Sequence, residues 1–152
     1  MSTSSKRFFE STKNIKSCDY FDSSEGLSLS VFPQELFLIV SLFAEDCNYN
    51  LINLYTDYGK RLFVSGYRLG RNTARNELLL RMGNKKLVVA RVEFIHQREG
   101  KMTELYRILK NIRKKYHLKP IIIESCVTEA SINWCLKNGF VPMDDGSFTE
   151  KE

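Results

Sequence analysis

Residues 97–103 have the types and the order that suit the binding of a phosphate group. They read Gln-Arg-Glu-Gly-Lys-Met-Thr, and they lie between an apolar run at 87–95 and a segment with helical spacing of apolar residues. A glycine-containing turn that opens a helix brings free backbone N–H groups together, and the helix dipole favours negative charge there. Arg98 and Lys101 add positive charge. The sequence therefore predicts a phosphate or pyrophosphate site, with an ordinary strand-to-helix turn as the alternative.

The same segment resembles the pyrophosphate loop of the GNAT acyl-CoA N-acetyltransferases, which reads Gln/Arg-x-x-Gly-x-Gly/Ala between a central strand and a helix. Gln97 takes the first position and Gly100 the fourth, while Met102 stands where Gly or Ala is usual. Residues 131–140 are similar to the last helix of that family, with its Gly-Phe ending. The resemblance covers about residues 61–142.

The resemblance implies acetyl-CoA as cosubstrate and an amine as acceptor. It implies that the main chain of the central strand contacts the pantetheine arm and that the loop amides hold the pyrophosphate. The residues implied to bind the cofactor are Phe94, Ile95, Gln97, Arg98, Glu99, Gly100, Lys101, Met102 and Thr103. Family members usually carry several residues between the strand and the Gln/Arg position, whereas here only His96 stands between Ile95 and Gln97.

Acetyl transfer to an amine needs a free amine and a proton for the departing thiolate, so it calls for a base and an acid. Glu93 on the expected central strand is the first candidate base, and Glu124 at the end of the next strand is the reserve. A solvent-facing glutamate and a lysine-paired glutamate are the respective alternatives. Alignment on Gly139 and Phe140 places Cys135 where the family has its acidic tyrosine. Cys135 is therefore the candidate acid, with a small buried hydrophobic residue as the alternative.

Composition bounds the class of protein. A chain of 152 residues suits one domain with a sizeable core, and 43% apolar with 27% charged residues is typical of a soluble globular protein. No apolar run is long enough for a membrane span. Four cysteines without a Cys-x-x-Cys pair and two histidines argue against a zinc site or a disulfide framework, and favour the cytoplasm.

The pattern of apolar residues predicts a mixed α+β fold, with a central mixed twisted sheet flanked by helices on both faces, as in GNAT proteins. Strands are expected at 27–32, 61–69, 75–82, 86–96 and 121–124. Helices are expected from Pro33 through 36–45, at 48–58, from Met102 to Tyr116, and after Thr128 up to Gly139. The run at 36–45 also fits a buried strand. We expect an N-terminal arm at 1–26, a single domain at 27–146 and an acidic tail at 147–152.

The net charge of +5 favours anionic partners. Basic residues gather on the helix after the loop and at its exit. A noncatalytic binding module that contacts nucleic acid or an acidic protein through this helix is therefore the alternative function. A homodimer is compatible with either function, and no membrane partner is expected.

Overall fold

The computed structural model describes residues 4–9, 33–48, 51–57, 61–67, 73–97 and 99–151. Its helices are α2 (Pro33–Asp46), α3 (Lys101–Lys115) and α4 (Glu129–Lys137). Its strands are β1 (Ser4–Phe9), β2 (Leu51–Asp57), β3 (Arg61–Tyr67), β4 (Ala74–Gly83), β5 (Lys86–Glu93), β6 (Ile122–Ile123), β7 (Phe140–Pro142) and β8 (Phe148–Glu150). The expected strand at 27–32 lies outside the described residues.

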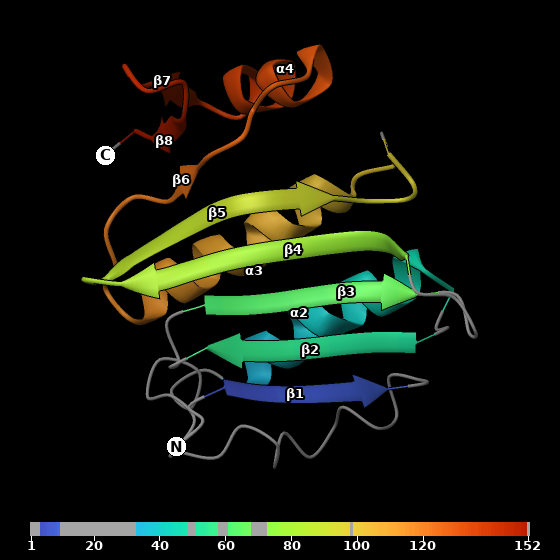
Figure 1. The fold of residues 1–152 in the computed structure, drawn as a ribbon. Coiled ribbons are helices and arrows are strands. Elements are labelled where there is room, and N and C mark those ends of the chain that lie inside the picture. The colour runs from blue at the N-terminus through green and yellow to red at the C-terminus, as the bar shows by residue number, and fades with distance from the viewer. Residues whose placement is uncertain are drawn as a thin grey trace.

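The strands form one mixed sheet in the order β1-β2-β3-β4-β5-β6-β8-β7 (Figure 1). Neighbours from β1 to β5 are antiparallel, β5 and β6 are parallel, and β8 is antiparallel to both β6 and β7. The parallel pair is joined through α3, as a strand-helix-strand crossover requires. The expected fold class, a mixed α+β fold around a central mixed sheet, is confirmed.

Helix α3 forms for the reason the sequence indicates. Its apolar residues recur at intervals of three and four, and the side chains at Leu105, Ile108, Leu109 and Ile112 are buried against the sheet. Three basic residues in its last turn, Arg113 to Lys115, interact favourably with the negative end of the helix dipole. This places the N-terminal end of α3 directly after the loop that follows β5.

The run at 36–45 is helical, so the alternative of a buried strand is excluded. Helix α2 buries Ile39, Val40 and Phe43 completely, and the Phe43 ring stacks on Phe94 with centroids 4.7 Å apart. Figure 1 shows α2 and α3 together behind β2 to β5, on one face of the sheet. Among the described residues, no helix is long and apolar enough to cross a bilayer.

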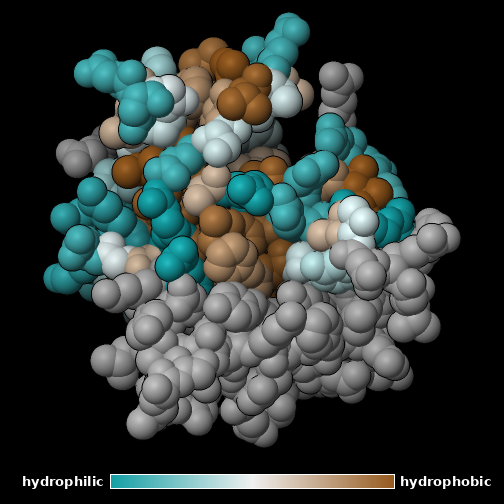
Figure 2. Space-filling view, in the orientation of Figure 1, coloured by the Kyte–Doolittle hydropathy of each residue, from teal (hydrophilic) through white to brown (hydrophobic). Residues whose placement is uncertain are grey.

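The opposite face of the sheet faces the viewer in Figure 2, which shows apolar residues in the middle of that face with polar residues to their left and right. Alternation along the strands puts Phe63 and Leu79, which are direct neighbours across β3 and β4, on this face. Both are half-buried, whereas the alternate residues on the helix-covered face, such as Leu62 and Leu78, are fully buried.

One expected element was wrong. Residues 48–58 were expected as a helix, but β2 runs through this segment because it pairs with β3 along its whole length and with β1 from Ile52 to Asp57. Ladder hydrogen bonds on two sides outweigh a helical spacing of apolar residues. The expected arm at 1–26 contributes the edge strand β1. The expected acidic tail at 147–152 contributes β8, which lies between β6 and β7.

The acidic Glu150 of β8 is buried because it satisfies several partners. Its carboxylate accepts hydrogen bonds from the backbone N–H of Ile121 at 2.8 Å and from the hydroxyl of Tyr106 at 2.5 Å. It also forms an ion pair with Arg113 at 2.9 Å. From its charge alone, Glu150 would be expected in contact with solvent, which is why the segment of β8 was expected as an acidic tail.

Candidate active site

A pocket of about 680 Å³ opens where β5 and β6 separate. Its walls come from four segments: the end of β5, the loop into α3, the chain after β6, and α4. Its volume is in the range of small-molecule sites, about 300–1,000 Å³.

Two features end the pairing of β5 with β6. The ladder contains only Val88 opposite Ile122 and Val89 opposite Ile123, after which the Glu124 N–H donates to the Val89 carbonyl at 2.8 Å. Strand β5 then bulges at Ala90. Leu79 and Leu80 are consecutive in β4, but their partners in β5 are Arg91 and Val89, so the pairing skips Ala90. The Ala90 carbonyl accepts a hydrogen bond from the Ser125 hydroxyl at 2.9 Å. A bulge re-aims the strand, so the last residues of β5 form the pocket wall.

The loop side of the pocket ends at Gly100, the N-cap of α3. Gly100 has φ 79° and ψ 7°, in the left-handed region that glycine adopts without strain, and no side chain caps the helix. The first backbone N–H groups of α3 therefore keep their capacity to bind an anion. Lys101, Met102 and Thr103 of this first turn all line the pocket.

Helix α4 forms the far wall. Thr128 is its N-cap as expected, in a capping box with Ser131, and Gly139 follows the helix with φ 82°. The Trp134 indole N–H donates to the Thr103 hydroxyl at 3.1 Å, which joins α4 to the start of α3. The Trp134, Tyr106 and Phe140 rings also pack together, with centroids 5.1 to 5.7 Å apart.

The expected cofactor residues divide into three groups. Those that line the pocket are Phe94, Gln97, Gly100, Lys101, Met102 and Thr103. Ile95 and Glu99 lie outside the pocket wall formed by the described residues, and the Ile95 N–H donates to a buried carboxylate, that of Asp46, rather than facing a ligand. Arg98 lies outside the described residues. Strand β5 ends at Glu93, three residues before the expected boundary, because the amides of Ile95 and His96 both bind Asp46.

Glu93 lies on the exposed face of β5 and lines the pocket. Its cross-strand partner is Glu77, which forms an ion pair with Arg91 at 3.6 Å. Glu124, the reserve candidate, also lines the pocket, but its carboxylate is hydrogen-bonded to Arg81. Among the described residues, the Glu93 carboxylate has no such cationic partner, in contrast to that of Glu124.

Cys135, the candidate acid, is buried at the back of the pocket with its sulfur 3.4 Å from that of Cys126. Burial, together with the hydrogen bond that the protonated thiol shares with Cys126, raises the pKa of the Cys135 thiol to about 12. A thiol this reluctant to ionise is poorly matched to proton transfer at neutral pH. These surroundings favour the alternative interpretation, in which Cys135 is a small packing residue.

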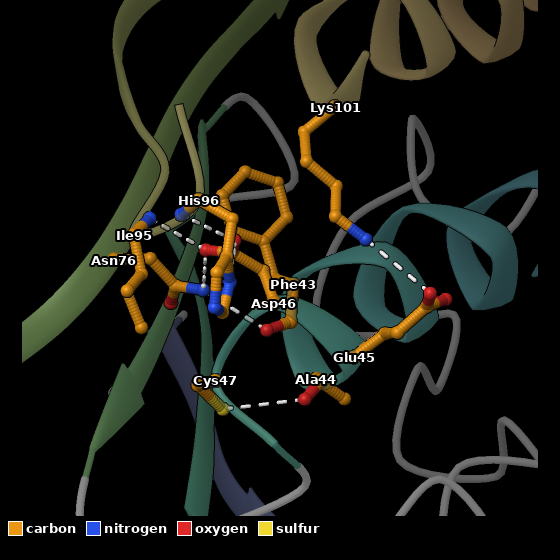
Figure 3. Close-up of polar contacts among 9 residues, drawn as sticks. All are labelled: Phe43, Ala44, Glu45, Asp46, Cys47, Asn76, Ile95, His96 and Lys101. Carbon is orange, nitrogen blue, oxygen red and sulfur yellow. Dashed lines mark hydrogen bonds and ion pairs between the residues drawn. The ribbon is translucent and has the colours of Figure 1, made fainter. Parts of the chain in front are cut away.

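A buried carboxylate supports the pocket from the side of α2 (Figure 3). Asp46, the last residue of α2, is fully buried and accepts hydrogen bonds from the Asn76 amide at 2.8 Å, the Ile95 N–H at 2.8 Å and the His96 N–H at 3.0 Å. The His96 ring Nδ1 lies 3.1 Å from the same carboxylate. Burial raises the pKa of Asp46, but these four hydrogen bonds together hold the pKa below its ordinary value.

Gly66 makes room for this cluster. A Cβ at Gly66 would lie 2.5 Å from the Asn76 side-chain oxygen and 2.8 Å from the Cys47 sulfur, so no other residue fits without displacing them. Lys101, the first residue of α3, is also linked to α2, with its ammonium 3.3 Å from the Glu45 carboxylate. The end of α2 therefore contacts the loop at both of its ends: Asp46 binds the residues before it, and Glu45 binds Lys101 after it (Figure 3).

Asp46 and His96 were not predicted from the sequence as site residues. They lie 50 residues apart in the chain, and no local motif joins them. One signal was present: an acidic residue at the C-terminal end of an apolar helix opposes the helix dipole, which implies a compensating partner. Among the described residues, no group of three His, Cys, Asp or Glu side chains is arranged to hold a metal ion.

Comparison with known proteins gives only distant likenesses. No family model matches the sequence, and no curated protein matches it. A crystal structure of PaiA N-acetyltransferase from Thermoplasma acidophilum in complex with coenzyme A is similar at a TM-score of 0.47 and 13% identity, over 97% of this chain and 99% of that one. The anti-CRISPR protein AcrVA5 is similar at a TM-score of 0.41 and 15% identity, over 50% of this chain and 90% of that one. Likenesses this distant establish neither a shared family nor a shared activity.

Proposed function

We propose that this protein is an N-acetyltransferase that binds acetyl-CoA in the pocket between β5 and β6 and transfers the acetyl group to an amine. The observation that carries the proposal is the position of that pocket. It begins at the uncapped N-terminal end of α3 and extends to the point where β5 and β6 separate. The described residues of the loop that resembles the GNAT pyrophosphate motif, apart from Glu99, line this pocket.

The residues present fit the proposed cosubstrate. A diphosphate suits the first turn of α3, where free N–H groups, the helix dipole and Lys101 act together. Beyond it, the pocket wall includes the apolar side chains of Val92, Phe94 and Ile123, which suit an uncharged arm. The main-chain groups of β5 beyond the Ala90 bulge lie along this wall.

The chemistry requires that the ammonium of the acceptor lose a proton before its nitrogen can attack. We propose that Glu93 accepts this first proton, directly or through water, and passes it to solvent. Its position on the pocket wall supports this role. Holding the amine and the thioester in one cavity supplies a further part of the rate, because it converts a bimolecular reaction into an intramolecular one.

The alternative function, binding of nucleic acid or an acidic protein through the basic helix, has less support. Several basic side chains of α3 are already neutralised by glutamates: Arg107 by Glu104, Arg113 by Glu150, and Lys115 by Glu35. The face is therefore less positive than the sequence suggests. A steep loss of binding to DNA or RNA with increasing salt would be the signature of this alternative.

The first prediction tests the cosubstrate. Acetyl-CoA and CoA at about 100 times their Kd are expected to raise the melting temperature by about 5–10 °C, since binding only the folded state stabilises it. ATP at the same concentration is expected to raise it much less, because it lacks the pantetheine arm that the apolar wall would contact. Differential scanning fluorimetry measures both. Equal shifts with ATP and CoA would indicate a general anion site and would refute the proposal.

The second prediction concerns Glu93. We expect Glu93→Gln to lower turnover about 100-fold in an assay that follows thiol release across a panel of amines, the size typical of a lost proton acceptor. The shift in melting temperature with CoA is expected to persist. Glu77→Gln is the matched control, because Glu77 is the direct cross-strand partner but does not line the pocket. Undiminished turnover in Glu93→Gln would exclude Glu93 from this role.

A further inference from the structure

The hydrogen bond between His96 and Asp46 determines the tautomer of the ring. An ionised carboxylate only accepts hydrogen bonds, so the ring Nδ1 at 3.1 Å must carry the proton. The backbone N–H of the same residue binds the same carboxylate oxygen at 3.0 Å, which restricts the ring further. In the neutral ring, Nε2 then has a free lone pair.

The position of His96 brings this residue to the wall of the proposed pocket. His96 lines the pocket, and its side chain is 42% exposed, whereas the carboxylate behind it is fully buried. No hydrogen bond to Nε2 is found in the part of the chain that the structure describes. A buried carboxylate hydrogen-bonded to an imidazole at the wall of a cavity is an arrangement by which proteins hold a histidine for proton transfer.

We propose that His96 is a catalytic residue of the acetyl transfer, held by Asp46 as its positioning residue, and that Nε2 carries the proton that moves from the attacking nitrogen to the departing sulfur. This inference rests on the proposed function. It assigns a donor for the thiolate that the position of the expected tyrosine, filled here by the buried Cys135, does not provide.

The transfer moves two protons from the acceptor and exchanges one carbon–sulfur bond for one carbon–nitrogen bond. The ammonium loses its first proton to solvent through Glu93. The neutral nitrogen then forms a bond to the thioester carbonyl carbon, the carbon–sulfur bond breaks, and Nε2 accepts the second proton from the nitrogen. The imidazolium returns that proton to the CoA thiolate. The products are the amide and free CoA, and His96 is neutral again.

The charged groups close to the His96 end of the pocket come from several elements. Helix α2 contributes Asp46 and Glu45, α3 contributes Lys101, and β5 contributes Glu93. Lys101 is paired with Glu45, so the buried carboxylate of Asp46 is the charge in direct contact with the ring. It stabilises the protonated imidazole that forms during transfer.

The test uses the full chain with an amine that the wild-type protein acetylates. We expect His96→Gln to lower kcat/KM about 100-fold or more. We also expect the dependence of kcat/KM on pH to differ from that of the wild-type protein, because one of the groups that exchange protons with the reactants is gone. The CoA-induced shift in melting temperature is expected to remain. His117→Asn is the matched control, because His117 is the only other histidine and does not line the pocket.

The role of Asp46 is tested by Asp46→Asn. In this variant the ring loses its ionised acceptor, so we expect kcat/KM to fall and the neutral ring to lose its preference for the proton at Nδ1, which nitrogen-15 NMR measures. A purely structural role would lower the rate without changing the tautomer. A second readout needs no acceptor: nitrogen-15 NMR of the wild-type imidazoles is expected to show the neutral His96 ring protonated at Nδ1.

The outcomes separate this inference from the proposed function. Wild-type turnover with an unchanged pH profile in His96→Gln would overturn the role of His96 and leave acetyl transfer standing. Protonation of the neutral ring at Nε2 in the NMR spectra would do the same. Absence of both CoA binding and turnover in the wild-type protein would overturn the proposed function, and this inference with it.

Discussion

Replacing Gly100 by aspartate is expected to abolish the stabilisation of the protein by acetyl-CoA and CoA. Gly100 lines the pocket at the N-terminal end of α3, and a Cβ built there meets no atom within 4 Å. The new side chain therefore has room to project, and its carboxylate would lie against the diphosphate that the helix end is proposed to bind. Like charges brought together at an interface cost several kcal/mol, so we expect affinity to fall by at least about 100-fold.

The matched control for this variant is Gly146→Asp. Gly146 has φ 87°, close to the 79° of Gly100, and an added Cβ there also meets nothing within 4 Å. It lies in the turn between β7 and β8 and does not line the pocket. Both variants carry the same added charge and a similar backbone strain of about 1 kcal/mol. Scanning fluorimetry should show similar melting temperatures without ligand, and loss of the CoA shift only in Gly100→Asp.

If CoA still raised the melting temperature of Gly100→Asp, the loop would not be part of the binding site, even if the rest of the proposal held. Isothermal titration of the two variants against CoA gives the same comparison as a ratio of dissociation constants. This second measurement guards against a case in which strain lowers the melting temperature enough to obscure a ligand shift.

The parts of the fold that the sequence predicts are those in which local signals agree with tertiary packing. The three-and-four spacing of apolar residues in α3, the Thr128 cap and the Gly139 stop are all in place. The turn between β4 and β5 also forms as expected. Asn84 and Lys85 both have positive φ, 51° and 59°, as a two-residue hairpin requires.

The parts that the sequence does not predict depend on contacts distant in the chain. The segment of β2 has the spacing of a helix, yet pairing with β1 and β3 decides its structure. The acidic β8 enters the sheet because Glu150 finds partners on α3 and before β6. Neither set of partners is visible in a window of ten or fifteen residues, which is the range over which periodicity is read.

The candidate site divides in the same way. The loop at Gly100 is local and was predicted, whereas its support by the end of α2 is not local. The sequence placed Glu93 on one face of β5 and Val92 on the other, and the structure agrees, with Glu93 opposite Glu77 and Val92 opposite the buried Leu78. His96 appeared only as the single residue between strand and motif. Its significance depends on Asp46, which only the folded chain brings to it.

Replacing Asp46 by alanine is expected to lower the free energy of unfolding by about 3–5 kcal/mol, the cost of removing one partner from a buried charged cluster. The carboxylate satisfies the Ile95 N–H and the Asn76 amide, and each buried donor left without an acceptor costs about 1–3 kcal/mol. Urea unfolding near neutral pH measures the loss. Glu45→Ala is the control, because Glu45 is 62% exposed and its single ion pair with Lys101 is expected to contribute at most about 1 kcal/mol.

The same variant is expected to show how the stabilisation depends on pH. Because the pKa of Asp46 in the folded protein lies below its ordinary value of 3.8, the unfolded chain takes up the proton first as the pH falls. The contribution of Asp46 is therefore complete above that ordinary value and is lost as the pH falls through the folded-state pKa. The difference in unfolding free energy between wild type and Asp46→Ala should then narrow below about pH 4. A difference that stays constant from neutral to acid pH would mean that the cluster holds the end of β5 by its shape and not by its charge.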